Sequence, residues 1–117
     1  MPKQVLVVDN ESGSRRNISF LLREQGYEVD EADDGLTALD LLDKKTFDLL
    51  ICDLMMPRLS GLEVVRRIES SPTSTSVILI TGHPDLLNEK SLGHLPSFTK
   101  PFNLYDLLRS VKQVLGE

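Results

Sequence analysis

Three continuous runs of apolar residues alternate along the chain with segments in which apolar residues recur at helical spacing. The runs Val5–Val8, Leu49–Cys52 and Val77–Ile80 are rich in Val, Ile and Leu, and each is too short to be a helix. Such runs are typical of strands covered on both faces, which usually lie in a parallel sheet. Weaker strands are predicted at Tyr27–Ala32 and Ser97–Thr99.

The intervening segments carry their apolar residues on one helical face. Four segments have such a stripe: Ile18, Leu21 and Leu22; Ala38, Leu39 and Leu42; Val64, Val65 and Ile68; and Leu104, Leu107, Leu108, Val111 and Leu115. Gly26 and Gly116 are expected to end helices, and Asp34-Gly35 is predicted to form a turn. A further short helix is expected within roughly Pro84–Leu92.

A strand followed by a helix is thus repeated about five times. This order predicts an α/β fold with a parallel sheet, right-handed crossovers and helices on both faces. We expect one domain over residues 1–117, because the chain shows no internal repeat and no linker long enough to divide it.

Composition narrows the classes of protein that fit this fold. The chain is 40% hydrophobic and 26% charged, with a formal net charge of -5, which disfavours nonspecific binding to nucleic acid or to an anionic membrane. Cys52 is the only cysteine, so no internal disulfide can form. No apolar run approaches the roughly 18 residues of a membrane span, and the start lacks a signal-peptide pattern. We therefore expect a soluble, cytoplasmic domain.

Candidate chemistry follows the strands, because ligands of open α/β sheets bind beyond the carboxyl ends of the strands. The polar residues at these positions are Asp9, Asn10, Glu11, Asp53, Thr81 and Lys100. Clustered carboxylates favour a divalent cation such as Mg²⁺. A carboxylate can also accept a phosphoryl group, and a cation, an ammonium and a hydroxyl can neutralise the phosphoryl oxygens. The set suits phosphoryl transfer to a carboxylate.

These motifs closely resemble those of the receiver domain of two-component response regulators. The segment "DLMMPRLSG", Asp53 to Gly61, fits the family pattern D-x-x-M-P-x-x-x-G. The acidic cluster at Asp9, "DDG" at 33–35, "VILITG" ending after Thr81, and "KPF" at 100–102 arrive in the family's order. The likeness covers essentially the whole chain.

The resemblance implies a flavodoxin-like (βα)5 three-layer sandwich with strand order 2-1-3-4-5. It implies that Asp53 takes a phosphoryl group from a sensor histidine kinase or a phosphotransfer protein, with Mg²⁺ or Mn²⁺ as cofactor. Asp9, Asp53, the residue at position 10 and the backbone carbonyl of Met55 would hold the metal. Thr81 and Lys100 would bind the phosphoryl oxygens and couple them to a conformational change. The Lys100-Pro101 peptide is expected to be cis.

Two departures from the family pattern bear on the expected site. The family usually has two adjacent acids after the first strand, whereas this chain has Asn10 as the second. An amide brings no charge, so we expect weaker Mg²⁺ binding that still permits phosphorylation, with Glu11 as a partial substitute. The usual switch aromatic is replaced by Ser97, and Phe98 comes one residue later, so it should point to the opposite face. The output surface is therefore expected to differ from the common one.

Several alternatives stay open at this point. Gly82 and His83 stand where similar domains tune phosphoryl lifetime, and a surface histidine without such a role fits His83 equally well. The fold could serve as a phosphorylation-independent pseudo-receiver, or as a small Mg²⁺-dependent phosphohydrolase. We favour a switch whose only catalysis is its own phosphorylation and dephosphorylation. The kinase, the effector domain or protein that it signals to, and a homodimer through the last helices are left open.

Overall fold

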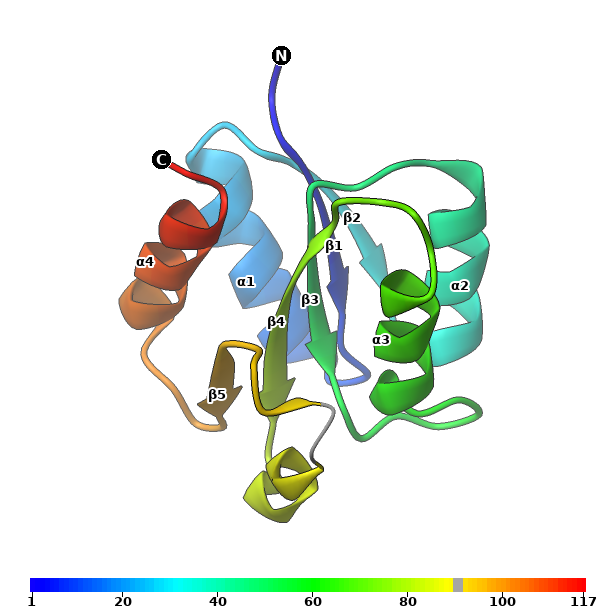
Figure 1. Ribbon diagram of the computed structural model, residues 1–117. Coiled ribbons are helices and arrows are strands. Elements are labelled where there is room, and N and C mark those ends of the chain that lie inside the picture. The colour runs from blue at the N-terminus through cyan, green and yellow to red at the C-terminus, as the bar shows by residue number, and fades with distance from the viewer. Residues whose placement is uncertain (90–91) are drawn as a thin grey trace.

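The computed structural model describes residues 1–89 and 92–117 and shows a three-layer α/β arrangement (Figure 1). The strands are β1 (Gln4–Val8), β2 (Glu28–Ala32), β3 (Leu49–Asp53), β4 (Ser76–Thr81) and β5 (Ser97–Thr99). The helices are α1 (Ser12–Glu24), α2 (Gly35–Lys44), α3 (Gly61–Glu69), the 3₁₀ helix η1 (Pro84–Asn88) and α4 (Leu104–Val114). None of the helices in the described parts of the chain has the length and hydrophobicity needed to span a membrane.

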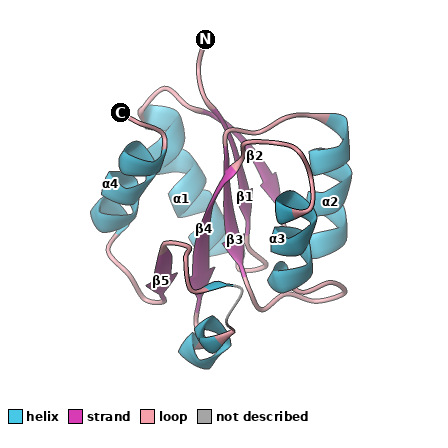
Figure 2. Ribbon diagram, viewed as in Figure 1, coloured by secondary structure: helices cyan, strands magenta, loops and turns pink. Residues whose placement is uncertain are grey.

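All five strands are parallel and lie in the order β2-β1-β3-β4-β5, which confirms the predicted flavodoxin-like topology. Helices α1 and α4 cover one face of the sheet, and α2 and α3 cover the other (Figure 1). Because the strands are parallel, their carboxyl ends and the loops that follow gather at one edge of the sheet (Figure 2).

The continuous apolar runs are buried on both faces, as predicted. Val5 and Val7 of β1 belong to the core under α1 and α4, with Ile18 and Leu107 among its helical members. Leu6 and Val8 of the same strand belong to the second core, whose helical members include Ala38, Val64, Val65 and Ile68. Successive strand residues point to opposite faces, so a central strand between two helical layers must be apolar at every position.

The helix ends follow the residues that the sequence placed there. Gly26 and Gly116 adopt positive φ angles of 92° and 74° after α1 and α4, a conformation that costs a glycine little. Gly35 differs from the prediction, since it is the first residue of α2 rather than part of a turn. Asp34 is the N-cap, and its side chain accepts a hydrogen bond of 2.8 Å from the Thr37 N–H. This cap lets the helix begin at Gly35.

The fourth connection departs from a strict (βα)5 repeat. The short helix expected within roughly Pro84–Leu92 is present as the five-residue 3₁₀ helix η1, while residues 90–91 of that range lie outside the described residues. Five residues that begin with proline offer too few i→i−4 hydrogen bonds to repay nucleation of an α-helix, so the tighter 3₁₀ turn forms. The predicted cis peptide between Lys100 and Pro101 is present.

Candidate functional site

The carboxyl ends of four neighbouring strands bring the predicted polar residues together. Asp9 directly follows β1, Asp53 and Thr81 are the last residues of β3 and β4, and Lys100 follows β5. All four converge because β1, β3, β4 and β5 are adjacent and parallel. The topology thus assembles two acids, a hydroxyl and an ammonium at one edge of the sheet.

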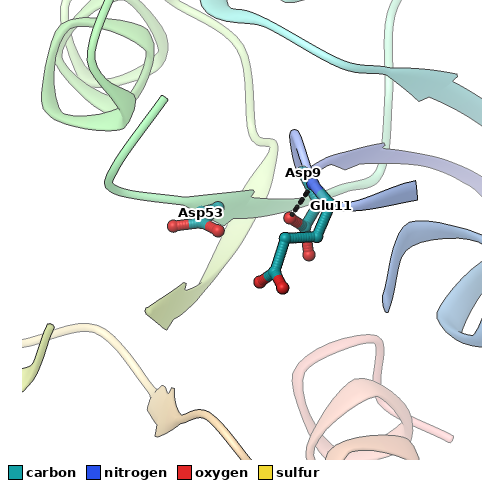
Figure 3. Close-up of side chains that lie close together, drawn as sticks. All are labelled: Asp9, Glu11 and Asp53. Atoms are coloured by element: carbon teal, nitrogen blue, oxygen red, sulfur yellow. Dashed lines mark hydrogen bonds between the residues drawn. The ribbon is translucent and has the colours of Figure 1, made fainter. Parts of the chain in front are cut away.

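Three carboxylates form the acidic part of the site. Asp9, Glu11 and Asp53 each offer an oxygen, and these oxygens lie within 4.8 Å of one another, close enough to hold a metal ion. Figure 3 shows the three side chains, with a dashed line for the 2.9 Å hydrogen bond that the Glu11 N–H donates to Asp9 Oδ1. Asp9 is fully buried and Asp53 is 3% exposed. Asp9 and Asp53 are buried like charges that repel one another, so positive charge beside them is favourable.

Lys100 supplies the positive charge within the described residues. Its Nζ lies 2.6 Å from Glu11 Oε1, 2.8 Å from Asp53 Oδ2 and 3.0 Å from Asp9 Oδ2. Three carboxylates around one ammonium leave an excess of two negative charges. Asp9 Oδ2 is also a buried oxygen that makes no hydrogen bond of acceptable geometry within residues 1–89 and 92–117. Both observations fit a site that can take a divalent cation in addition to Lys100.

The ionisation of the site reflects burial opposed by Lys100. Burial raises the pKa of Asp53, the nearby Asp9 charge raises it further, and hydrogen bonds from Lys100 and from the Met55 N–H lower it. The net pKa of Asp53 lies above its ordinary value. Burial alone would lower the pKa of Lys100, but its hydrogen bonds to Asp53, Glu11 and Asp9 outweigh burial and raise it. Lys100 is therefore a permanent cation at this site.

The loop after β3 contacts both the carboxylate and the backbone of Asp53. The Met55 N–H donates a 3.0 Å hydrogen bond to Asp53 Oδ1, which orients the carboxylate. Gly61 begins α3 directly against the backbone of Asp53 and Leu54, where an added Cβ would lie only 2.7 Å from Leu54 Cα. The Gly61 N–H donates to the Leu54 carbonyl at 3.0 Å. This contact explains physically why the segment after Asp53 ends in glycine.

Thr81 is buried and sits at the end of β4. Its Oγ1 accepts a hydrogen bond of 2.9 Å from the His83 N–H, and its hydroxyl lies 3.4 Å from the His83 carbonyl. The Lys100 N–H donates to the Thr81 carbonyl at 2.7 Å, which ties β4 to the lysine that follows β5. Thr81 is thus linked to His83 and to Lys100, and among the described residues its hydroxyl proton makes one long contact.

A small hollow of about 190 Å³ opens beside Asp53. Its lining gathers most of the remaining predicted residues: Asn10, Glu11, Asp53, Met55, Gly82 and His83. Asn10 is exposed at this rim, and no atom of the described residues lies within 4 Å of where a Cβ on Gly82 would stand. Asp53 is therefore buried yet reachable by a small group from this side.

Ser97 and Phe98 lie apart from the acidic cluster. Ser97 is exposed, whereas Phe98 is half-buried and packs on the α1 and α4 side of the sheet. The ring of Phe98 lies 5.9 Å from that of Phe102. The Phe98 ring of β5 therefore packs on the face of the sheet opposite to the one that holds Leu92 and α3.

Arg15 is a residue of this region that sequence reasoning did not identify. Its guanidinium donates to the Asp9 carbonyl at 2.9 Å and pairs with Glu31 of β2 at 3.1 Å. Arg23 pairs with the same Glu31 at 3.1 Å. Arg15 lies one helical turn after Glu11, but no spacing rule connects it to a carbonyl at the end of β1 or to a side chain of β2, the strand that follows its helix.

The fold and this constellation define the class of protein. The family model of the response regulator receiver domain matches residues 5–112, and the chain belongs to that family. The resemblance predicted from the sequence is thereby confirmed. Receiver domains are signalling switches of two-component systems.

Individual relatives match over nearly the whole chain. The chain is 33% identical over 118 residues to sporulation initiation phosphotransferase F of Bacillus subtilis, covering 98% of this chain and 95% of that protein. It is 36% identical over 122 residues to the response regulator MprA of Mycobacterium sp. (strain KMS), covering 98% of this chain and 51% of that protein. The chain therefore spans about half the length of the MprA relatives that it matches.

Solved structures agree with the fold. The response regulator TrrA from Thermotoga maritima, solved in complex with Mg²⁺-BeF, superposes with a TM-score of 0.87 at 34% identity, covering 96% of this chain and 98% of that one. The chemotaxis protein CheY4 of Vibrio cholerae superposes with a TM-score of 0.85 at 34% identity, covering 97% and 99% of the two chains.

Proposed function

We propose that this chain is a phosphoacceptor receiver domain in which Asp53 takes a phosphoryl group from a sensor histidine kinase or a phosphotransfer protein. The observation that carries the proposal is the position of Lys100, whose Nζ lies 2.8 Å from Asp53 Oδ2 inside a cluster of three carboxylates. An acid that is buried, paired with an ammonium and open to a hollow has the surroundings that phosphoryl transfer to a carboxylate requires.

In the transfer, a carboxylate oxygen of Asp53 forms a bond to phosphorus while the bond between phosphorus and the donor imidazole nitrogen breaks. The electron pair of that bond stays on the imidazole nitrogen, which then takes up a proton. Asp53 must be ionised to attack, and the hydrogen bond from Lys100 favours the ionised form against the effect of burial. Lys100 also remains beside the phosphoryl oxygens, where its charge offsets theirs.

Mg²⁺ or Mn²⁺, when bound, supplies further positive charge to the phosphoryl oxygens. Asp9 and Asp53 would hold it, together with the Asn10 amide oxygen and the Met55 carbonyl. The excess negative charge around Lys100 and the buried Asp9 Oδ2 support this assignment. The complex of the related TrrA with Mg²⁺-BeF supports the choice of Mg²⁺.

Thr81 and Lys100 would carry the change of state to the surface. Within residues 1–89 and 92–117, the Thr81 hydroxyl proton makes only a 3.4 Å contact with the His83 carbonyl, so it is available to a phosphoryl oxygen. A shift of Thr81 would alter its hydrogen bond with the His83 N–H. Gly82 and His83 line the hollow beside Asp53 and would there tune the lifetime of the phosphoryl group. Ser97 and Phe98 would transmit the change differently from the usual aromatic switch.

As part of the same proposal, the single domain acts in the cytoplasm as a switch whose own catalysis is limited to its phosphorylation and dephosphorylation. Its net charge of -5 supports partners other than nucleic acid and membranes. The switch signals to an effector domain or to a separate effector protein. The MprA relatives are about twice as long as this chain, and this length supports an effector domain in those proteins.

The experiment incubates the protein with acetyl phosphate and Mg²⁺ and measures its intact mass, beside Asp53→Asn and the control Asp33→Asn. Asp33 is exposed and outside the acidic cluster, so its variant should be phosphorylated like the wild type. We expect a phosphorylated adduct that is lost only in Asp53→Asn. An absent adduct would favour the pseudo-receiver, which Asn10 and Ser97 also favour, and many turnovers on small phosphate esters would favour a hydrolase.

A further inference from the structure

Position 10 carries an amide where similar domains usually carry a second acid. Asn10 is exposed at the rim of the hollow beside Asp53 and brings no negative charge. A divalent cation bound there would be offset by Asp9 and Asp53 alone, unless another residue replaces the missing charge. The structure shows which residue is placed to do so.

Glu11 extends into the acidic cluster from the next position along the chain. One of its carboxylate oxygens lies within 4.8 Å of oxygens of both Asp9 and Asp53 (Figure 3). Glu11 is the N-cap residue of α1, but its side chain makes no capping hydrogen bond. Its backbone is held instead by the hydrogen bond from its N–H to Asp9 Oδ1. The backbone is therefore fixed to the site, while the carboxylate has no role in starting the helix.

The charges around Lys100 give a second, independent observation. Lys100 contacts all three carboxylates, and its shortest contact is the 2.6 Å one to Glu11. One ammonium leaves two negative charges uncompensated. The fully buried Asp9 Oδ2 also lacks a hydrogen bond of acceptable geometry among the described residues. Three carboxylates plus Lys100 are balanced by one divalent cation, and this balance requires the charge of Glu11.

We propose that Glu11 supplies the third negative charge of the cation site, in place of the acid missing at position 10. The inference rests on the proposed function, because it assumes that the site takes Mg²⁺. A different role predicts a different result. If Glu11 served only to hold Lys100, its charge would not act on the cation, and its removal would leave Mg²⁺ binding unchanged or would strengthen it.

The test measures Mg²⁺ affinity by isothermal titration calorimetry, with no readout of phosphorylation. Glu11→Gln keeps the shape of the side chain and removes its charge. We expect it to weaken Mg²⁺ binding about tenfold, which corresponds to about 1.4 kcal/mol. The double variant Asn10→Asp/Glu11→Gln moves the charge to the usual position and should restore affinity to within about threefold, or about 0.7 kcal/mol, of the wild type.

Glu24→Gln is the matched control, since Glu24 is an exposed acid at the far end of α1, about 20 Å along the helix from Glu11. It should bind Mg²⁺ as the wild type does. Equal or tighter binding by Glu11→Gln would overturn the inference about Glu11 alone. A wild type that binds no Mg²⁺ would overturn the proposed function together with the inference, so the two failures are distinguishable.

Discussion

Replacing Lys100 by methionine removes the ammonium that holds the three carboxylates together and keeps most of the aliphatic side chain. The side chain of Lys100 is only 14% exposed, and those of Asp9 and Asp53 are 0% and 5% exposed. The variant therefore leaves two buried acids without their cationic partner. We expect a folded but less stable protein, because an uncompensated buried charge is costly.

The magnitude follows from the distances at the site. At about 3 Å, an ion pair gains about 1.4 kcal/mol even at the dielectric constant of bulk water, about 80. Asp9 and Asp53 lie 3.0 and 2.8 Å from Lys100, so the two pairs together are worth about 3 kcal/mol. Glu11 is 64% exposed, and solvent screens most of its contribution. Since burying Lys100 has its own cost, we expect a net loss of about 2–3 kcal/mol at neutral pH.

Urea denaturation followed by far-UV circular dichroism measures this loss, and a lower melting temperature, by about 8–12 °C, accompanies it in a domain of this size. Without Lys100, the pKa of Asp53 should rise above its already raised value, because Lys100 is its main lowering influence. A raised pKa in the folded state means that the folded protein takes up the proton more readily than the unfolded chain. Stability from this protonation is fully present below the unfolded pKa, about 3.9, and is lost as pH rises through the folded pKa.

The difference between wild type and Lys100→Met should therefore shrink near pH 4, roughly where carboxylates titrate. The control Lys44→Met removes a lysine whose side chain is 69% exposed and whose pair with Asp40 lies on the surface. It should leave the free energy of unfolding unchanged within error. Equal stability of Lys100→Met and wild type at neutral pH, or a difference that persists undiminished near pH 4, would refute this account of the site.

Two further predictions concern the frame around the site. Gly61→Ala should lower the free energy of unfolding by about 2 kcal/mol in urea denaturation, because the added Cβ would meet the backbone of Asp53 and Leu54. The control Gly13→Ala places a Cβ in α1 with no described atom within 4 Å, and it should be neutral or stabilise the protein by up to about 1 kcal/mol. Burial and the hydrogen bond to Glu117 raise the pKa of Tyr27 to about 12, so the stability that Tyr27 contributes is complete below about pH 10 and is lost as pH rises through about 12. Absorbance titration of Tyr105→Phe, which leaves Tyr27 as the only tyrosine, checks the value, and a midpoint near 10 would contradict it.

Strands and helices were predicted well where the local pattern was strong. The run at Val5–Val8 lies within β1, which begins one residue earlier, at Gln4. The run at Leu49–Cys52 lies within β3, which ends one residue later and so includes Asp53. The short helix expected within roughly Pro84–Leu92 is present at Pro84–Asn88, where its few residues form a 3₁₀ helix. Asp34-Gly35 was predicted as a turn, since an aspartate that caps a helix and one that forms a turn look alike in sequence.

For the candidate site, the polar residues that follow the strands were identifiable from sequence, because parallel strands share one carboxyl edge. Their partners were not. The roles of Arg15 and of its pair with Glu31 depend on how α1 packs against β2, and no local pattern records that packing. Glu11 was recognised only as a partial substitute for the acid missing at position 10, without its contact to Lys100.

The sequence by itself determined the element types, the strand order implied by the family motifs, and the positions of Asp9, Asp53, Thr81 and Lys100 at strand ends. These properties follow from short-range periodicity and from motifs a few residues long. Only the tertiary structure decided how their charges meet. Lys100 contacts Asp53, Glu11 and Asp9 across separations of 47, 89 and 91 residues. Contacts over such separations exist only after the sheet has assembled, because the packing of several elements sets where each side chain ends.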